Sequence, residues 1–138
     1  MQILIIDGHG GQLGAQLVKA VSAQFPKAGL TAVGTNAVAT AAMLKAGAET
    51  AATGENPVLV ACRRADVILG PIGIVIADAL QGEVTPRMAA AVGQADAVRI
   101  LLPMNRCGNL VAGVQDVSTK ALIEDAVLKL RDVLAGQG

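Results

Sequence analysis

Short aliphatic runs without polar alternation constrain the fold of this chain more than any other feature. The runs are QILII at residues 2–6, LTAVG at 30–34, ADVILG at 65–70 and AVRILLP at 97–103, with a weaker run near 49–53. A strand that has no polar face suits a sheet that is covered on both faces. We therefore expect a sheet of about five strands, buried between two layers of helices.

The segments between these runs have the spacing of helices. An apolar residue recurs every fourth position within 11–24, and an alanine-rich segment covers 37–48. Two further helices are expected to begin where proline follows a capping residue, at 56–57 (Asn-Pro) and at 85–86 (Thr-Pro). A last apolar stripe runs through 118–134 and predicts a C-terminal helix.

Strands and helices that alternate in this way predict an α/β fold. Crossover helices pair successive strands in parallel, and right-handed crossovers place helices on both faces of the sheet. We expect one three-layer (αβα) domain over residues 1–138, with a mostly parallel sheet whose first strand is central. The segment NLVAGV at 109–114 is a candidate for an additional edge strand, which we leave unplaced.

The charge balance excludes one class of partner. Eleven basic residues face eleven acidic ones in a chain of 138 residues, whereas binding to a nucleic-acid backbone needs clustered Lys and Arg. No stretch reaches the roughly 20 apolar residues of a membrane helix. The N-terminus already has the pattern of a strand, with no basic and apolar leader. We expect a cytoplasmic protein that binds neither nucleic acid nor membrane.

The apolar content is high for so short a chain, with a mean hydropathy of +0.55. PIGIVIADAL at 71–80 is the clearest excess, and large exposed apolar patches usually mark interfaces. We interpret the excess as a buried subunit interface and expect a homodimer or a higher homo-oligomer. Cys62 and Cys107 are far apart and lack the spacing of a metal site, so we expect free thiols and no metal.

Four glycines follow the first run, with the spacing Gly8-x-Gly10-Gly11-x-x-Gly14. A strand that turns through glycines into a helix presents free N–H groups and the positive end of the helix dipole to an anion. The spacing exceeds the dinucleotide fingerprint G-x-G-x-x-G by one residue, and glycines that only permit tight packing remain the alternative. The contacts expected for a phosphate are Gly8, His9, Gly10, Gly11, Gln12, Leu13 and Gly14.

Other short polar or glycine-bearing loops follow the remaining strands, at the edge where ligands bind in parallel sheets. From them we expect cofactor contacts by Thr35, Asn36, Gly70, Pro71, Ile72 and Gly73. Further ligand contacts are expected from Asp7, Thr53, Gly54, Glu55, Asn56, Asn105 and Arg106. Local bonding at turns and helix starts is the alternative for Asp7, Glu55 and Asn56, and for Asp7 it is the better explanation.

A ribose is usually held by Asp or Glu at the end of the second strand. This chain has Thr35 and Asn36 there, and nothing nearby supplies the Arg that a 2′-phosphate needs. NAD or a mononucleotide is therefore the expected cofactor, in preference to NADP. A flavin is disfavoured because the only aromatic ring, Phe25, lies on a buried helix stripe.

Candidates for catalysis are few. His9 is the only histidine and lies within the glycine segment, and Cys107 follows Arg106, whose charge favours a thiolate. Neither has the partners of a catalytic triad, so catalysis stays open. We expect a small nucleotide- or phosphate-binding protein. The alternatives are a non-catalytic sensor or subunit that uses the same cleft, and a structural oligomer without a ligand.

Six motifs extend over nearly the whole chain: DGHGGQLG, GTNAVATAAMLKAGA, TGEN, GPIGI, GEVTPRMA and PMNRCG. Together they resemble a family of short bacterial proteins that is known only as a domain of unknown function. The resemblance implies a Rossmann-like cytoplasmic protein. It implies no activity that can be carried over to particular residues.

Overall fold

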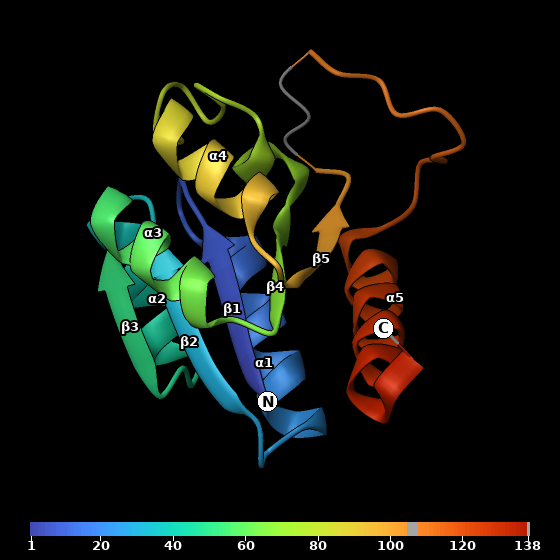
Figure 1. The fold of residues 1–138 in the computed structure, drawn as a ribbon. Coiled ribbons are helices and arrows are strands. Elements are labelled where there is room, and N and C mark those ends of the chain that lie inside the picture. The colour runs from blue at the N-terminus through green and yellow to red at the C-terminus, as the bar shows by residue number, and fades with distance from the viewer. Residues whose placement is uncertain (105–107, 138) are drawn as a thin grey trace.

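The computed structural model describes residues 1–104 and 108–137, and it contains a five-stranded parallel sheet (Figure 1). The strands are β1 (Gln2–Asp7), β2 (Gly29–Gly34), β3 (Thr50–Thr53), β4 (Val67–Pro71) and β5 (Val98–Leu102). The helices are α1 (Gln12–Gln24), α2 (Ala37–Lys45), α3 (Glu55–Arg64), α4 (Pro86–Gln94) and α5 (Thr119–Asp132), with two short helical segments, η1 (Ile72–Val75) and η2 (Val133–Gln137).

The order of the strands is β3-β2-β1-β4-β5, so the first strand is central, as the sequence predicts. The chain leaves β1 toward one edge through β2 and β3, then crosses back to β4 and β5. Asp7 and Gly34 are partners in the register of β1 and β2, at the carboxyl ends of both strands. This reversal places the loops after β1 and β4 on either side of the point where α/β sheets bind ligands.

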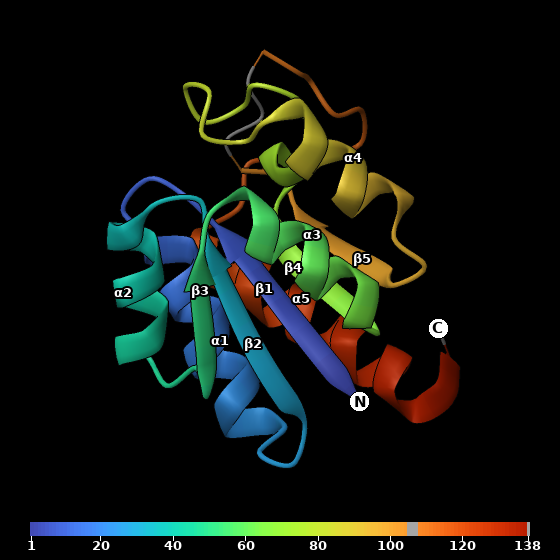
Figure 2. The same ribbon diagram turned by 60° about the vertical axis from the view of Figure 1, so that its left-hand side comes forward.

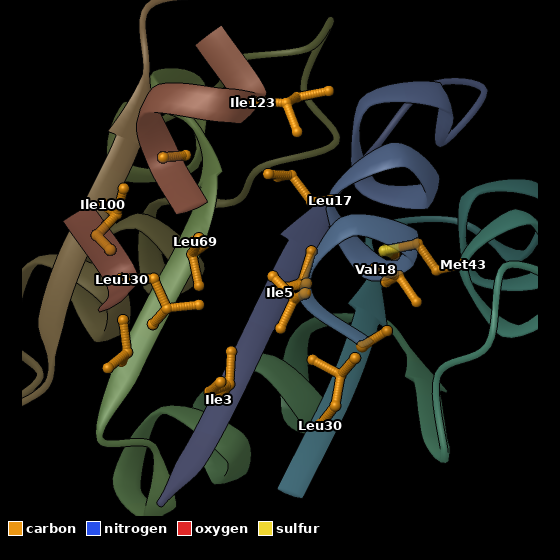
Figure 3. Close-up of a cluster of buried hydrophobic side chains, with 14 of the residues drawn as sticks. Ile3, Ile5, Leu17, Val18, Leu30, Met43, Leu69, Ile100, Ile123 and Leu130 are labelled. Carbon is orange, nitrogen blue, oxygen red and sulfur yellow. The ribbon is translucent and has the colours of Figure 1, made fainter. Parts of the chain in front are cut away.

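Helices cover both faces of the sheet (Figure 2). Ile3 and Ile5 of β1 contribute to a core that contains residues of α1, α2 and α5, part of which is drawn in Figure 3. Leu4 and Ile6 point to the opposite face, where the core contains residues of α3 and α4. All four side chains are at most 1% exposed, which explains why this strand has no polar alternation.

One of the two predicted helix starts is confirmed and the other is wrong. Thr85 caps α4 by accepting a hydrogen bond from the N–H of Met88. However, α3 begins at Glu55 after Gly54, whose φ of 105° suits glycine, and Asn56 lies inside the helix. Pro57 is tolerated as the third helical residue because the first N–H groups of a helix have no intrahelical acceptor.

The segment at 109–114 is not an edge strand. It is irregular and mostly exposed, and β5 forms the edge of the sheet on that side. A turn closes it, in which the N–H of Val114 donates to the carbonyl of Val111, and Gly113 has a φ of 84°. A left-handed residue of this kind interrupts the extended backbone that a strand requires.

The stretch at 71–80 is not an exposed interface patch. Ile74, Ala79 and Leu80 are each at most 3% exposed and belong to the core beneath α4. The stretch therefore covers this chain's own sheet. Throughout the described residues, no helix has the length and apolar character needed to cross a membrane.

Candidate functional site

A tight turn connects β1 to α1 at the carboxyl edge of the sheet. The N–H of Gly11 donates to the carbonyl of Gly8 at 2.9 Å, and α1 begins at the next residue. His9 and Gly11 both have left-handed backbone conformations, with φ of 50° and 75°. The left-handed region is uncommon for a side-chain-bearing residue, so the turn holds His9 in a strained conformation.

Asp7 fixes this turn from its inner side. The carboxylate is 3% exposed, and its two oxygens accept the N–H groups of Gly8 at 2.8 Å and Gly14 at 2.7 Å. Burial raises the pKa of the Asp7 carboxyl, although the two N–H groups oppose that shift. Asp7 thus has the local structural role that the sequence allowed, and it satisfies one N–H in the first turn of α1.

Three of the four glycines are needed for close packing. A Cβ at Gly8 would overlap the hydroxyl of Thr35, one at Gly11 would lie 2.6 Å from the Cα of Ala39, and one at Gly14 would lie 2.6 Å from the sulfur of Met43. Gly10 differs, because a Cβ there would meet no atom within 4 Å. The turn therefore packs tightly on the inside and is open at Gly10.

Three N–H groups, in the turn and at the start of α1, make no hydrogen bond within the described residues. The described part of the chain provides no acceptor for the N–H groups of Gly10, Gln12 and Leu13. The N-cap residue Gly11 has no side chain, the first turn of α1 holds no acidic residue, and Asp7 accepts only the N–H of Gly14. These donors lie at the positive end of the helix dipole.

Glu83 binds the outer side of the turn, and the sequence analysis did not identify it. Its Oε1 accepts from the N–H of His9 at 2.9 Å, the hydroxyl of Thr35 at 2.6 Å and the side-chain amide of Asn36 at 2.8 Å. Burial alone would raise the pKa of Glu83, but these hydrogen bonds outweigh it and hold the pKa below its usual value. Glu83 joins the loops after β1 and β2.

Asn36 is engaged by the protein itself. Its Oδ1 caps α2 by accepting the N–H of Ala39, and its amide nitrogen donates to the carbonyl of His9 and to Glu83. Both amide protons are therefore used. A sugar hydroxyl that accepts from Asn36 would have to replace one of these acceptors, whereas one that donates could use the second lone pair of Oδ1.

The residues at 70–73 lie at the end of β4 and in η1. Gly70 is buried, and a Cβ there would overlap the carbonyl oxygen of Ile6 on β1. Gly70 permits close contact between the two central strands. Pro71 and Gly73 are also buried, whereas Ile72 is half-buried.

The expected contacts at 53–56 bond mainly to other elements. Glu55 accepts the hydroxyl of Thr85 at 2.6 Å and forms an ion pair with Arg87 at 3.5 Å, which ties α3 to α4. The N–H of Gly54 donates to the carbonyl of Gly34. Thr53 shares a hydrogen bond with Thr40, and Asn56 lines a separate hollow of about 520 Å³ between α3 and the sheet.

Of the two candidate catalytic residues, the structure describes only His9. The side chain of His9 is exposed, while its backbone is held by Glu83 and Asn36. Cys107 lies outside the described residues, as do Asn105 and Arg106. Cys62 is a free and buried residue of α3, and burial raises the pKa of its thiol to about 11. Within 1–104 and 108–137, no group of three His, Cys, Asp or Glu side chains could hold a metal ion.

The fold and the loops at the carboxyl edge of the sheet define the class of the protein. It is a Rossmann-like α/β protein with a parallel sheet and a glycine-bearing turn between its first strand and first helix. The chain belongs to the family described as a domain of unknown function (DUF3842), which it matches over residues 2–135.

Other comparisons add little. No curated protein matches the sequence. One similar solved structure is a dodecameric FMN-dependent UbiX-like decarboxylase from Escherichia coli O157:H7, which is 11% identical, with a TM-score of 0.46 and coverage of 98% of this chain and 94% of that one. A similarity this distant says nothing about the ligand of the present chain.

Proposed function

We propose that this protein binds a small phosphate-bearing ligand, a nucleotide, at the turn between β1 and α1. The observation that carries the proposal is the set of three N–H groups, on Gly10, Gln12 and Leu13, that have no acceptor in the described structure. They lie beside the open position at Gly10. A phosphate that accepts from them would complete the first turn of α1.

The geometry favours a ligand over a purely structural turn. Packing accounts for Gly8, Gly11 and Gly14, each of which has a neighbour where a Cβ would stand. Packing does not account for Gly10, which has free space around it, and glycine at such a position costs roughly 0.4–1 kcal/mol relative to alanine through the entropy of the unfolded chain. A ligand that approaches the backbone closely explains why glycine occupies this position.

Charge also supports an anion at this position. The first turn of α1 contains no acidic residue, and the buried carboxylate of Asp7 accepts only one of its N–H groups, that of Gly14. The nearest carboxylates, Asp7 and Glu83, are already bonded to the N–H groups of other residues. Catalysis is not part of this proposal, and a sensor or subunit would use the same turn.

Calorimetric titration with inorganic phosphate and with AMP tests the proposal. We expect both to bind the wild-type protein, and we expect Gly10→Val to abolish binding while the fold is retained, because a side chain there enters open space. Gly93→Val is the matched control, since Gly93 lies exposed on α4 and also has free space around it. Equal binding by wild type and Gly10→Val would refute the proposal.

We also propose that the protein forms a homo-oligomer. The stretch at 71–80 packs on its own sheet and gives no support for a subunit interface. However, α2 exposes Val38 to 66% and Leu44 to 53%. A subunit contact over α2 would remove both apolar side chains from water. Light scattering at micromolar concentration tests the assembly, and a monomer for both wild type and Val38→Glu would contradict it.

A further inference from the structure

We infer that Glu83 accepts the ribose hydroxyls of the bound nucleotide, and that it selects nucleotides with an unmodified 2′,3′-diol. The inference rests on the proposed function and adds the sugar to it. Nucleotide-binding α/β proteins commonly hold the ribose with an acidic residue at the end of the second strand. In this chain that position holds Thr35, and the carboxylate comes from elsewhere.

The strap at 76–85, between η1 and α4, supplies this carboxylate. It crosses the carboxyl ends of β1 and β2 (Figure 2), and Glu83 bonds there to Thr35 and Asn36, the two residues that follow β2. The same oxygen accepts the N–H of His9 in the glycine turn. Glu83 therefore lies next to the proposed phosphate site, on the side where a ribose would follow.

One oxygen of Glu83 remains for a ligand. All three hydrogen bonds converge on Oε1, and no group within the described residues donates to Oε2. The three donors fix the orientation of the carboxylate, so Oε2 is presented without further loss of side-chain freedom. A carboxylate oxygen only accepts, which suits the two hydroxyl donors of a diol.

The strap is built to hold Glu83 in place. Asp78, Leu80 and Gln81 have left-handed φ of 66°, 57° and 57°. Such conformations persist only where the surrounding structure enforces them, and they cluster at ligand sites. Leu80 is 2% exposed and anchors the strap, and the N–H of Asp78 donates to the carbonyl of Val84, while the N–H of Val84 donates to the carbonyl of Ala79.

The carboxylate also predicts which nucleotides are rejected. A phosphate on the 2′-oxygen would bring a second negative charge against Glu83, and a 2′-deoxyribose would leave Oε2 without one donor. The described partners of Glu83 include no Lys or Arg that could offset the repulsion. The predicted order of affinity is AMP, then 2′-deoxy-AMP, then adenosine 2′,5′-bisphosphate.

Titration of these three probes against wild type and Glu83→Gln tests the inference. The variant keeps the oxygen that Thr35, His9 and Asn36 bind and removes the charge. We expect its affinity for AMP to fall about tenfold, because an NH2 group replaces Oε2, and an NH2 group cannot accept the hydrogen bonds that the diol donates to a carboxylate. Its affinity for adenosine 2′,5′-bisphosphate should rise. Glu49→Gln, just before β3 at the opposite edge of the sheet, removes the same charge as a control and should change neither.

Opposite shifts for the two probes are the signature of a ribose acceptor. If both affinities rise in Glu83→Gln, the carboxylate is an internal anion that competes with the ligand, and the inference is overturned. If both fall together, Glu83 only supports the turn, and the inference is likewise overturned. Should the variant not fold, the order of the three probes on the wild type decides.

Inorganic phosphate separates this inference from the function on which it rests. Phosphate has no ribose, so its binding should be the same in Glu83→Gln as in Glu49→Gln. Binding of phosphate and AMP without the predicted order of probes overturns the ribose role alone. Failure of both to bind the wild type overturns the proposed function and this inference with it.

Discussion

The two sides of the glycine turn are held by carboxylates in opposite environments. On the inner side, Asp7 is buried, and that burial raises its pKa, even though two N–H groups donate to it. On the outer side, Glu83 is half-buried, and three donors outweigh its burial and lower its pKa. The surroundings of a carboxylate therefore decide whether its negative charge stabilises or destabilises the fold. The inner carboxylate holds the turn through two N–H groups, whereas the outer carboxylate keeps one oxygen, Oε2, that accepts from no group within the described residues.

The largest effect on stability is expected from Gly11→Val, which inserts a side chain on the inner side. Its Cβ would lie 2.6 Å from the Cα of Ala39, and its φ of 75° is unfavourable for a β-branched residue. We expect a loss of about 2–4 kcal/mol in the free energy of unfolding, from left-handed strain and overpacking together. Urea unfolding measures it. A loss below 1 kcal/mol, as expected at Gly10, would show that α1 and α2 can move apart freely.

Asp7→Asn should have the next largest effect, because it places an amide group against an N–H donor. We expect a loss of about 1–3 kcal/mol, the cost of an unsatisfied buried donor. Asp66→Asn is the matched control, since Asp66 also accepts a backbone N–H, that of Gln2, but is exposed. Equal losses in the two variants would mean that burial does not distinguish Asp7.

The sequence predicted the elements that local pattern determines. Aliphatic runs predicted the buried strands, and the alternation with helices predicted a parallel sheet with β1 at its centre. The cap at Thr85 followed from a threonine before proline. These features depend on neighbours in sequence or on rules that hold for all α/β sheets.

Long-range contacts could not be predicted in the same way. Glu83 bonds to Thr35 across 48 positions, and its surrounding QGEVTP indicates only a turn before a helix. The stretch at 71–80 has the composition of an interface, yet it folds back onto its own sheet. Its conformation depends on left-handed residues such as Leu80, which no propensity predicts. Only the three-dimensional structure shows that the strap at 76–85 contacts the turn between β1 and α1.

The smallest effect on stability is expected from Glu83→Gln, and its pH dependence sharpens the comparison. The folded pKa of Glu83 lies below its ordinary value of 4.5, so the stability that its charge contributes is fully present above that value. It is lost as the pH falls through the folded pKa. Asp7 behaves in the opposite sense: its folded pKa is raised above 3.8, so its charge costs stability at neutral pH, and that cost disappears as the pH falls. Urea unfolding between pH 7 and pH 3 measures both effects. As the pH falls, the free energy of unfolding of wild type should approach that of Glu83→Gln. Over the same fall in pH, the free energy of unfolding of wild type should rise relative to that of Asp7→Asn. If the two differences in free energy of unfolding, wild type against Glu83→Gln and wild type against Asp7→Asn, change in the same direction with pH, the two sides of the turn do not differ electrostatically.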